Sequence, residues 1–290
     1  MTKGKLDNAP DQGAWPSLED LKFLDNEADP GAAMGMFVLP HPSMSYELPA
    51  SHDVFGTDLL GRHEWRRSLY VQEFLCETDW KAKLTPIMDA AYGDADFETE
   101  VQAVFEKLDD EPEQKKRRDD ILGETVDYLG VFENTLHIDS FSHPLTIFFA
   151  RVMMRTGWEV AVHFKEKYGQ IRPVKLDPLN IKPIIRTPSH PSFPSAHATQ
   201  AHLAKLALSA VIDGRLDQEF SDRMNDIANE IAVNREYAGV HYASDSTAGM
   251  NLAQSIWDIA VAQQAFKTLI AEAKAEWDRP IQAGLQFFDP

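Results

Sequence analysis

The sequence predicts an all-α protein, a bundle of helices. Apolar residues recur at helical spacing in several long stretches, and no stretch of note shows the alternation of a β-strand. Clusters of Pro and Gly separate these stretches, as they do at the ends of helices. With 290 residues, 43% of them hydrophobic, the chain can bury one large core. We expect an extended N-terminal arm over residues 1–55 and one helical domain over residues 56–290.

The N-terminal half carries three helical signals. Residues 1–55 are rich in Pro, Gly, Asp and Ser and lack a helical pattern. Helical spacing begins in Leu59–Leu75, and Asp96–Leu108 is a stronger helix because acidic residues occupy its first turn. Glu111–Asp119 is a charged run that we expect to be solvated, and it leads into an apolar stripe over Ile121–Leu136.

The C-terminal half is predicted to be more strongly helical. Ser142 and Pro144 are typical of a helix start, and that helix should run to Tyr168 and stop at Gly169. Five prolines, at positions 178, 183, 188, 191 and 194, predict a stiff loop next. Three further helices are then expected, over Ala196–Ile212, Leu216–Glu236 and the Ala-rich stretch Ser244–Lys274.

Charge and composition exclude several classes of partner. The net charge is −18, and such a surface repels nucleic acid and anionic membranes, so we expect neither as a partner. No apolar run approaches the roughly 20 residues of a membrane span, and Met1–Leu24 lacks the apolar core of a signal peptide. Cys76 is the only cysteine, which excludes an internal disulfide. We expect a soluble cytoplasmic protein that acts on small molecules, and the Ala-rich helices and the arm suggest a possible homodimer.

Three basic segments in an acidic chain indicate an anion site. The first segment runs from Lys165 to Pro173 and contains Arg172. The second runs from His190 to His197, and the third begins at Arg235 and ends at Asp245. Arginine meets a tetrahedral oxyanion as a planar fork of donors and lysine meets it as a point charge. Because the three lie on different elements, we expect them to converge around one such anion. Ser195 and Ala196 open a predicted helix, where backbone N–H groups and the helix dipole favour an anion.

Two histidines add chemistry to that anion site. His241 and Asp245 are four residues apart, so on a helix they share a face, and the carboxylate can fix the imidazole tautomer. An imidazole oriented in this way is a candidate nucleophile toward phosphorus, or a ligand to a phosphate-like metal oxide. His197 stands beside the serine turn and is a candidate general acid or base.

The motifs Lys-x6-Arg-Pro, Pro-Ser-x-His and Arg-x5-His-x3-Asp, between Lys165 and Asp245, resemble the type 2 phosphatidic acid phosphatase superfamily. This superfamily includes soluble acid phosphatases and vanadium-dependent haloperoxidases, and its all-α fold agrees with the pattern above. The resemblance implies that residues 56–290 form a catalytic domain. It also implies that the oxyanion is held by Lys165, Arg172, Ser195, Ala196 and Arg235.

The resemblance also implies catalytic roles. His197 would be the acid or base, and Asp245 would orient His241. His241 would be the nucleophile of a phosphatase or the metal ligand to vanadium, and Lys165 would polarise peroxide in a haloperoxidase. The chain departs from the pattern twice, because Ala196 replaces the usual glycine and Asn234 stands where phosphatases often have serine.

The resemblance leaves two activities open. His190 lies seven residues before His197, as a histidine does in bromoperoxidases, which implies a halide or substrate pocket at His190. This favours a haloperoxidase that uses vanadate and oxidises bromide or iodide with hydrogen peroxide. The short connections between the motifs favour the alternative, a soluble acid phosphatase that forms a phosphohistidine intermediate and needs no cofactor. A pocket that binds phosphate without turnover is the third possibility.

Overall fold

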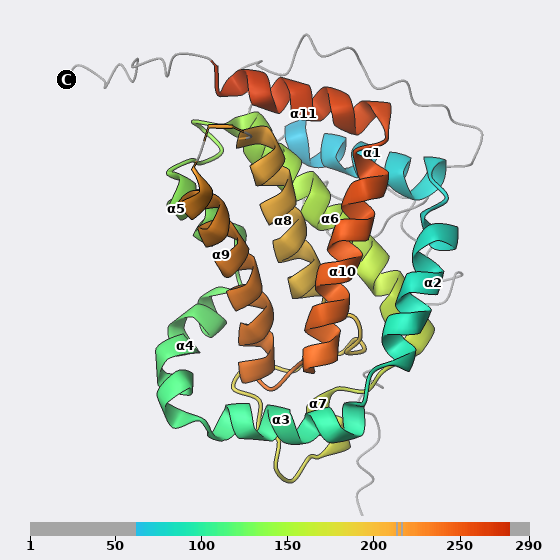
Figure 1. Ribbon diagram of the computed structural model, residues 1–290, viewed down its shortest axis with the longest axis vertical. Helices are drawn as coiled ribbons and strands as arrows, with labels where there is room; N and C mark the ends of the chain where they lie inside the picture. The colour runs from blue at the N-terminus through green and yellow to red at the C-terminus, as the bar shows by residue number, and fades with distance from the viewer. Residues whose placement is uncertain (1–61, 213, 216, 279–290) are drawn as a thin grey trace, which may run out of the picture. The chain divides into compact units, whose positions relative to one another are not determined.

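The computed structural model describes residues 62–278, apart from residues 213 and 216 and the side chains of residues 62–65 (Figure 1). The arm expected over residues 1–55 lies outside this part. Every regular element in the described part is helical, which confirms the all-α class. In chain order the helices are α1 (Arg62–Glu77), α2 (Trp80–Gly93), α3 (Phe97–Asp109), α4 (Glu111–Gly123), α5 (Leu129–Leu136), α6 (Pro144–Tyr168), α7 (Pro173–Leu176), α8 (Ala196–Ile212), α9 (Gln218–Tyr237), α10 (Ala243–Ala260) and α11 (Gln264–Glu276).

The centre of the domain is α8, which packs against α6, α9 and α10 (Figure 1). Small residues suit it to this place, because a helix surrounded by others needs little side-chain volume on each face. The buried alanines of α8 are Ala196, Ala198, Ala201, Ala204 and Ala207. The sequence predicted the bounds of this helix correctly.

Two glycines let α6 and α10 approach α8 closely. A Cβ atom on Gly157 of α6 would lie 2.5 Å from Leu203 Cδ1. A Cβ atom on Gly249 of α10 would lie 2.6 Å from the carbonyl oxygen of Ser195. The two glycines therefore clamp α8 from two sides, and Gly249 sets the depth at which the Ser195 turn lies.

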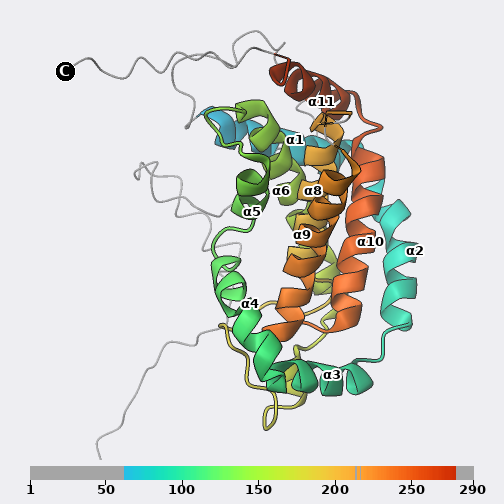
Figure 2. The same cartoon turned by 60° about the vertical axis from the view of Figure 1, so that its left-hand side comes forward.

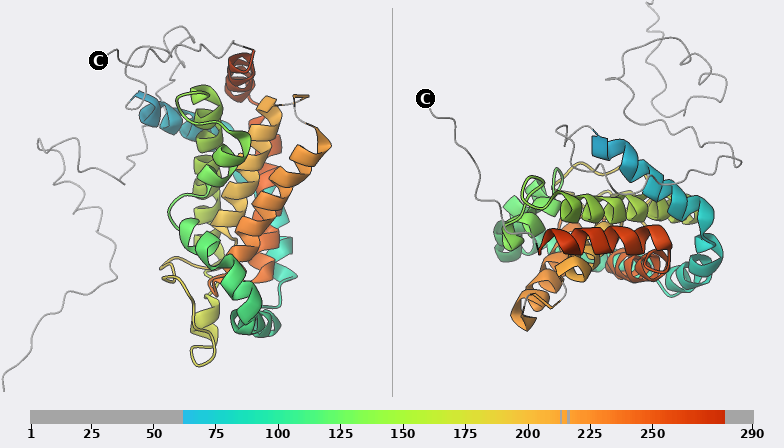
Figure 3. Two further views of the ribbon diagram at one scale, coloured as in Figure 1. Left: turned by 90° about the vertical axis from the view of Figure 1, so that its left-hand side faces the viewer. Right: turned by 90° about the horizontal axis from the view of Figure 1, so that it is seen from above.

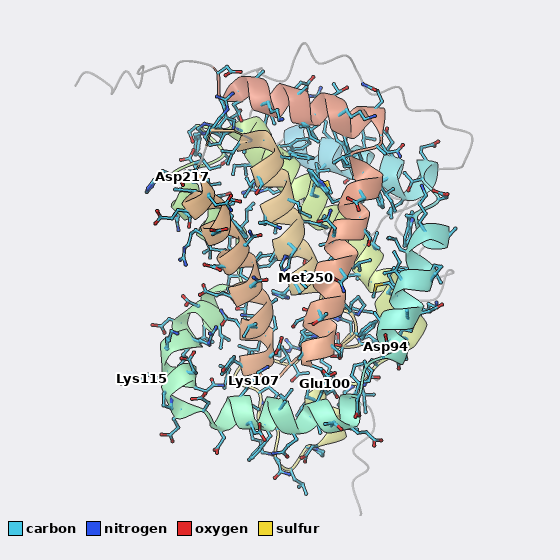
Figure 4. All side chains as sticks on the ribbon, in the orientation of Figure 1. Asp94, Glu100, Lys107, Lys115, Asp217 and Met250 are labelled. Carbon is cyan, nitrogen blue, oxygen red and sulfur yellow. The ribbon has the colours of Figure 1, made fainter. Side chains whose placement is uncertain are left out.

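The four central helices bring the motif-bearing segments to one end. Helices α6 and α9 finish there, while α8 and α10 start there, at the lower end in Figure 1. Helix α3 runs across this end and α2 lies along the flank of α10 (Figure 2). Glu100 of α3 accepts a hydrogen bond from Ser244 N at 2.8 Å, and Lys107 of α3 pairs with Glu236 (Figure 4). Helix α3 is thus tied to both α9 and α10.

The opposite end is closed by α11, which crosses over α6 and α8 (Figure 3). Glu276 of α11 accepts hydrogen bonds from Leu145 N and Thr146 N at 3.0 Å each, and from Thr146 Oγ1 at 2.9 Å. The N-terminus of α6 is therefore capped by a carboxylate from 130 residues away along the chain. The prediction that Ser142 caps this helix was wrong, because the residue at the cap position is His143 and it makes no side-chain capping bond.

Other boundaries also differ from the sequence prediction. The charged run at Glu111 belongs to α4, whose first turn is capped by Asp110 through Glu113 N at 3.2 Å. The apolar stripe over residues 121–136 is not one helix, because Asp127 accepts hydrogen bonds from Leu129 N and Gly130 N and starts α5 afresh.

The sequence prediction also differs from the structure at α2, α10 and α11. The Ala-rich stretch breaks after Ala260 into α10 and α11, and α2, which holds Pro86, was not predicted. None of the helices between residues 62 and 278 is both long enough and apolar enough to cross a lipid bilayer.

Candidate active site

The motif residues gather at the end of the bundle where α6 and α9 finish and α8 and α10 begin. Lys165 and Arg235 lie in the last turns of α6 and α9, and Asp245 lies in the first turn of α10. Each charge thus sits at the helix end where the dipole stabilises it. Arg172 precedes α7, and none of these four residues nor His241 is more than 2% exposed. The structure thus brings these residues to one end of the bundle, and their binding of an anion stays a prediction.

Arg172 contacts two of the site histidines, His190 and His241. Its NH1 donates to the carbonyl of Val240 at 2.6 Å and lies 3.2 Å from His241 Nε2. Its NH2 lies 3.1 Å from His190 Nδ1, and its Nε donates to the carbonyl of His190 at 3.1 Å. Because a guanidinium only donates, His241 Nε2 accepts its bond through a lone pair, whereas His190 Nδ1 lies 3.2 Å from the carbonyl of Pro191 as well and can donate to it in the other tautomer. Burial lowers the pKa of Arg172 to about 10, so the guanidinium stays charged at neutral pH.

The orientation of His241 is fixed by Asp245, although not in the way the spacing suggested. His241 lies before α10 rather than on it, and Tyr242 is the cap residue. Asp245 Oδ2 is 2.7 Å from His241 Nδ1 and accepts a bond from Tyr242 N at 3.0 Å. The contact therefore comes from a helix start that folds back, and a turn at Gly239, with φ of 76°, leads the chain into it.

The protonation of this pair follows from its surroundings. Burial lowers the pKa of His241 well below its usual value, and the charges of Arg172 and Lys165 lower it further. Burial raises the pKa of Asp245 to about 6, while a bond from Ser192 Oγ lowers it. At neutral pH an ionised Asp245 accepts the Nδ1 proton of a neutral His241, so Nε2 keeps its lone pair on the side of Arg172.

Lys165 is held by the loop that precedes α8. Its Nζ donates to the carbonyls of Pro191, Ser192 and Pro194 at 3.0, 2.7 and 2.6 Å. Burial lowers the pKa of Lys165 to about 7, and the charge of Arg172 lowers it while that of Asp245 raises it. All three ammonium donors are thus engaged, and the part of Lys165 in anion binding stays a prediction.

The Ser195 turn is also engaged with its own fold. Ser195 N donates to the carbonyl of Asp245 at 2.9 Å, and Ser195 Oγ accepts from Ala198 N at 3.3 Å. Ser195 therefore acts as the cap of α8 and ties α8 to α10. The predicted anion-binding role of Ser195 and Ala196 stays a prediction.

Arg235 has a partner that the sequence did not reveal. Glu124, which follows α4 and is 4% exposed, binds Arg235 NH2 through Oε2, and the carbonyl of Ile121 accepts from the same nitrogen at 3.0 Å. Glu124 Oε1 accepts a bond from Asn234 Nδ2 at 2.8 Å. The only signal of this contact was Asn234 in place of serine, whose partner 110 residues earlier was not visible.

His197 and His190 are the motif histidines that keep some exposed surface. Packing around the imidazole of His197 lowers its pKa to about 3, and the nearby charges of Arg235, Lys165 and Arg172 act in the same direction. Burial, Lys165 and Arg172 lower the pKa of His190 to about 4. The ring of His197 packs against Tyr128 at 5.0 Å and the ring of His190 against Trp158 at 5.6 Å. Both imidazoles are neutral near pH 7.

The site retains donors that suit an oxyanion. Nε and NH1 of Arg235 are buried and have no hydrogen-bond partner within the described residues. A buried unpaired donor on a charged group costs free energy, and a bound anion would remove that cost. The two unpaired donors of Arg235 suit phosphate or vanadate, whereas the donors of Arg172 and the Nε2 lone pair of His241 are engaged with each other or with the loops and would have to be released to an anion.

The chain has few similarities to known proteins. No protein-family model matches the chain, and no curated protein sequence matches it. Among solved structures it is similar to one described as the first bacterial vanadium-dependent iodoperoxidase, with a TM-score of 0.47 and 19% identity. That similarity covers 58% of this chain and 50% of the other, so the chain spans about half the length of that protein. A similarity of this size says nothing about the activity of this chain.

Proposed function

We propose that this protein is a vanadate-dependent haloperoxidase that oxidises bromide or iodide with hydrogen peroxide. The observation that carries the proposal is the geometry around His241. Asp245 fixes the Nδ1–H tautomer, so that Nε2 presents a lone pair to the buried face where Arg172 lies. Arg235 adds two buried donors without partners. This combination offers one metal ligand and a cationic cage for the oxygens of a small oxyanion.

The donor set fits vanadate as it fits phosphate, which is its near-isostere. His241 Nε2 would be the ligand, and Arg172, Arg235 and the Ser195 turn would hold the oxygens. When bound, vanadate supplies a Lewis-acid centre that activates peroxide toward halide without a change in oxidation state. Lys165, with a pKa near 7, would add a positive charge or a proton once an anion replaces one of its carbonyl partners.

The neutral histidines suit proton acceptance and selection of reactants. His197 is uncharged near pH 7, and the negative charge of a bound oxyanion would raise its low pKa, so that it could take a proton from hydrogen peroxide as the peroxide enters. His190 is likewise neutral near pH 7, and Arg172 and the carbonyl of Pro191 hold its Nδ1 in place. Since these two imidazoles carry the exposed surface of the site, peroxide and halide would enter beside them.

A soluble acid phosphatase is the second candidate. The connections from Pro173 to Pro194 and from His197 to Arg235 are short, as in compact acid phosphatases. His241 Nε2 would then attack phosphorus and His197 would protonate the leaving oxygen. The burial of every cation favours the haloperoxidase instead, because peroxide and halide reach a closed site more easily than a phosphomonoester does.

The test uses the full chain loaded with vanadate. We expect bromination of an activated diketone in the presence of bromide and peroxide, and loss of it in His241→Ala. A chain that hydrolyses p-nitrophenyl phosphate and does not brominate is an acid phosphatase. A chain that binds phosphate tightly and turns over neither substrate is a binding protein, and the enzyme proposal is then wrong.

A further inference from the structure

Among the residues that the structure describes, Glu124 is a buried carboxylate at the site to which the proposed reaction gives no role. It lies just after α4 and holds Arg235 NH2, while its other oxygen accepts the bond from Asn234. The other charged and titratable groups of the site are the cations, the imidazoles and Asp245, which holds His241. The negative charge of Glu124 competes with an incoming anion for the same cation, Arg235. The protonation state of Glu124 should therefore affect anion binding.

Neighbouring residues hold Glu124 in this position. Arg117 NH1 donates to Asn234 Oδ1 at 2.9 Å, so the amide must turn its NH2 group toward Glu124. Arg117 is itself held by Glu113 at 2.9 Å and packs over the ring of Tyr237 at 4.8 Å. A serine at position 234 could not bridge Arg117 and Glu124, because a hydroxyl is too short. The departure from the phosphatase pattern thus places the carboxylate.

The arrangement leaves Arg235 with two different faces. One face is filled by Glu124 and the carbonyl of Ile121, and on the other face Nε and NH1 have no partner among the residues that the structure describes. An oxyanion on the second face places a second negative charge on the same guanidinium. In a site this buried, two such charges repel strongly, and a proton on Glu124 removes the repulsion.

We propose that Glu124 takes up a proton when an oxyanion binds to Arg235, so that the pocket binds its anion and a proton together. The inference rests on the proposed oxyanion site and deepens it. The proton comes from solvent and forms an O–H bond on the carboxylate of Glu124, and no other bond changes. The pocket should therefore bind its anion more tightly under conditions in which a proton is available to Glu124.

The charged and titratable groups around Glu124 agree with this role. Burial raises the pKa of Glu124 to about 7, the charge of Arg235 and the bond from Asn234 lower it, and Asp120 raises it. From α8, His197 hydrogen-bonds to the backbone of Glu124, and Tyr128 packs on His197. Because His197 also responds to a bound anion, only a comparison with a Glu124 variant isolates the proton on Glu124.

The sign of the effect follows from linkage. An anion that raises the pKa of Glu124 binds more tightly when Glu124 is protonated, so lowering the pH strengthens binding. Above the pKa of free Glu124, the affinity should fall by up to about tenfold per pH unit, until the pKa of the complex is reached.

The experiment measures inorganic phosphate binding to the full chain by calorimetry at pH 8, in buffers of different ionisation enthalpy. Wild type should take up roughly one proton more than Glu124→Gln, because phosphate ionisation and the histidine contributions are common to both proteins. Glu106→Gln removes an exposed carboxylate from α3 at the same end and should behave as wild type. Equal proton uptake in wild type and Glu124→Gln overturns the inference and leaves the oxyanion site standing.

A second variant decides the matter if Glu124→Gln does not fold, since it leaves Arg235 buried without its counter-ion. Asn234→Ser removes a hydrogen bond that stabilises the ionised carboxylate and so should move the fall in phosphate affinity to higher pH. An unshifted pH profile in Asn234→Ser overturns the inference. A wild type that binds no phosphate overturns the oxyanion site, and this inference with it.

Discussion

The two ends of the helical bundle use buried carboxylates for opposite purposes. At the α11 end, Glu276 accepts three hydrogen bonds from the start of α6. At the other end, Asp245 Oδ1 and two nitrogens of Arg235 are buried and have no hydrogen-bond partner in the described part of the chain. The three hydrogen bonds of Glu276 stabilise the fold. The unsatisfied groups at the second end cost stability, and such groups mark the place where a ligand is needed.

The largest expected effect separates the two ends by activity. His241→Ala removes the imidazole that Asp245 orients, and turnover should fall by about a thousandfold or more. His143→Ala, which removes the ring packed on Trp277 at the α11 end, should leave turnover per folded molecule unchanged. Activity assays on both variants, with circular dichroism as the control for folding, measure the contrast. Comparable losses in the two variants would break the comparison.

The next effect concerns stability. Glu276→Ala leaves Leu145 N, Thr146 N and Thr146 Oγ1 without their acceptor, so the free energy of unfolding should drop by about 2–4 kcal/mol. Turnover of the remaining folded protein should be unchanged. Denaturant unfolding gives the first quantity, and an assay corrected for the folded fraction gives the second. Glu276→Gln keeps one acceptor oxygen and should lose less stability than Glu276→Ala does.

A smaller effect should touch folding and site together. Gly249→Ala places a methyl group against the Ser195 carbonyl, so α8 and α10 must separate, at a cost of about 1–3 kcal/mol. The same shift moves the turn that carries His197, so turnover should fall as well. Gly93→Ala is the matched control, because an added Cβ there meets nothing within 4 Å. If Gly249→Ala is as active and stable as Gly93→Ala, the clamp on α8 does not position the site.

The smallest effect is a pH dependence of stability at the site end. The pKa of Lys165 falls from 10.5 to about 7 on folding, so between these values the unfolded chain holds a proton that the folded chain lacks. Raising the pH through this window therefore favours the folded state, by on the order of 1 kcal/mol per pH unit. In Lys165→Met this increment should vanish. Unfolding free energies of both proteins at pH 7 and pH 9.5 measure it, and equal slopes would contradict it.

The sequence alone determined the helices whose signals are local. The apolar and alanine pattern of α8 and the Pro144 and Gly169 boundaries of α6 are encoded within a few residues, because capping and periodicity act over one or two turns. The motif between Lys165 and Asp245 is also visible in the sequence, and the anion chemistry that it predicts stays a prediction. Helices that alternate in direction then bring those residues to one end.

Only the tertiary structure decided which groups are satisfied and which are left over. The cap of α6 comes from Glu276 and the counter-ion of Arg235 from Glu124, and both contacts span more than 100 residues. Local sequence patterns do not predict such pairs, because the sequence around a carboxylate does not show whether it faces water or a buried guanidinium. The folded packing removes water from these groups, and desolvation turns an ordinary Lys165, Glu124 or Asp245 into one whose proton affinity is set by its neighbours.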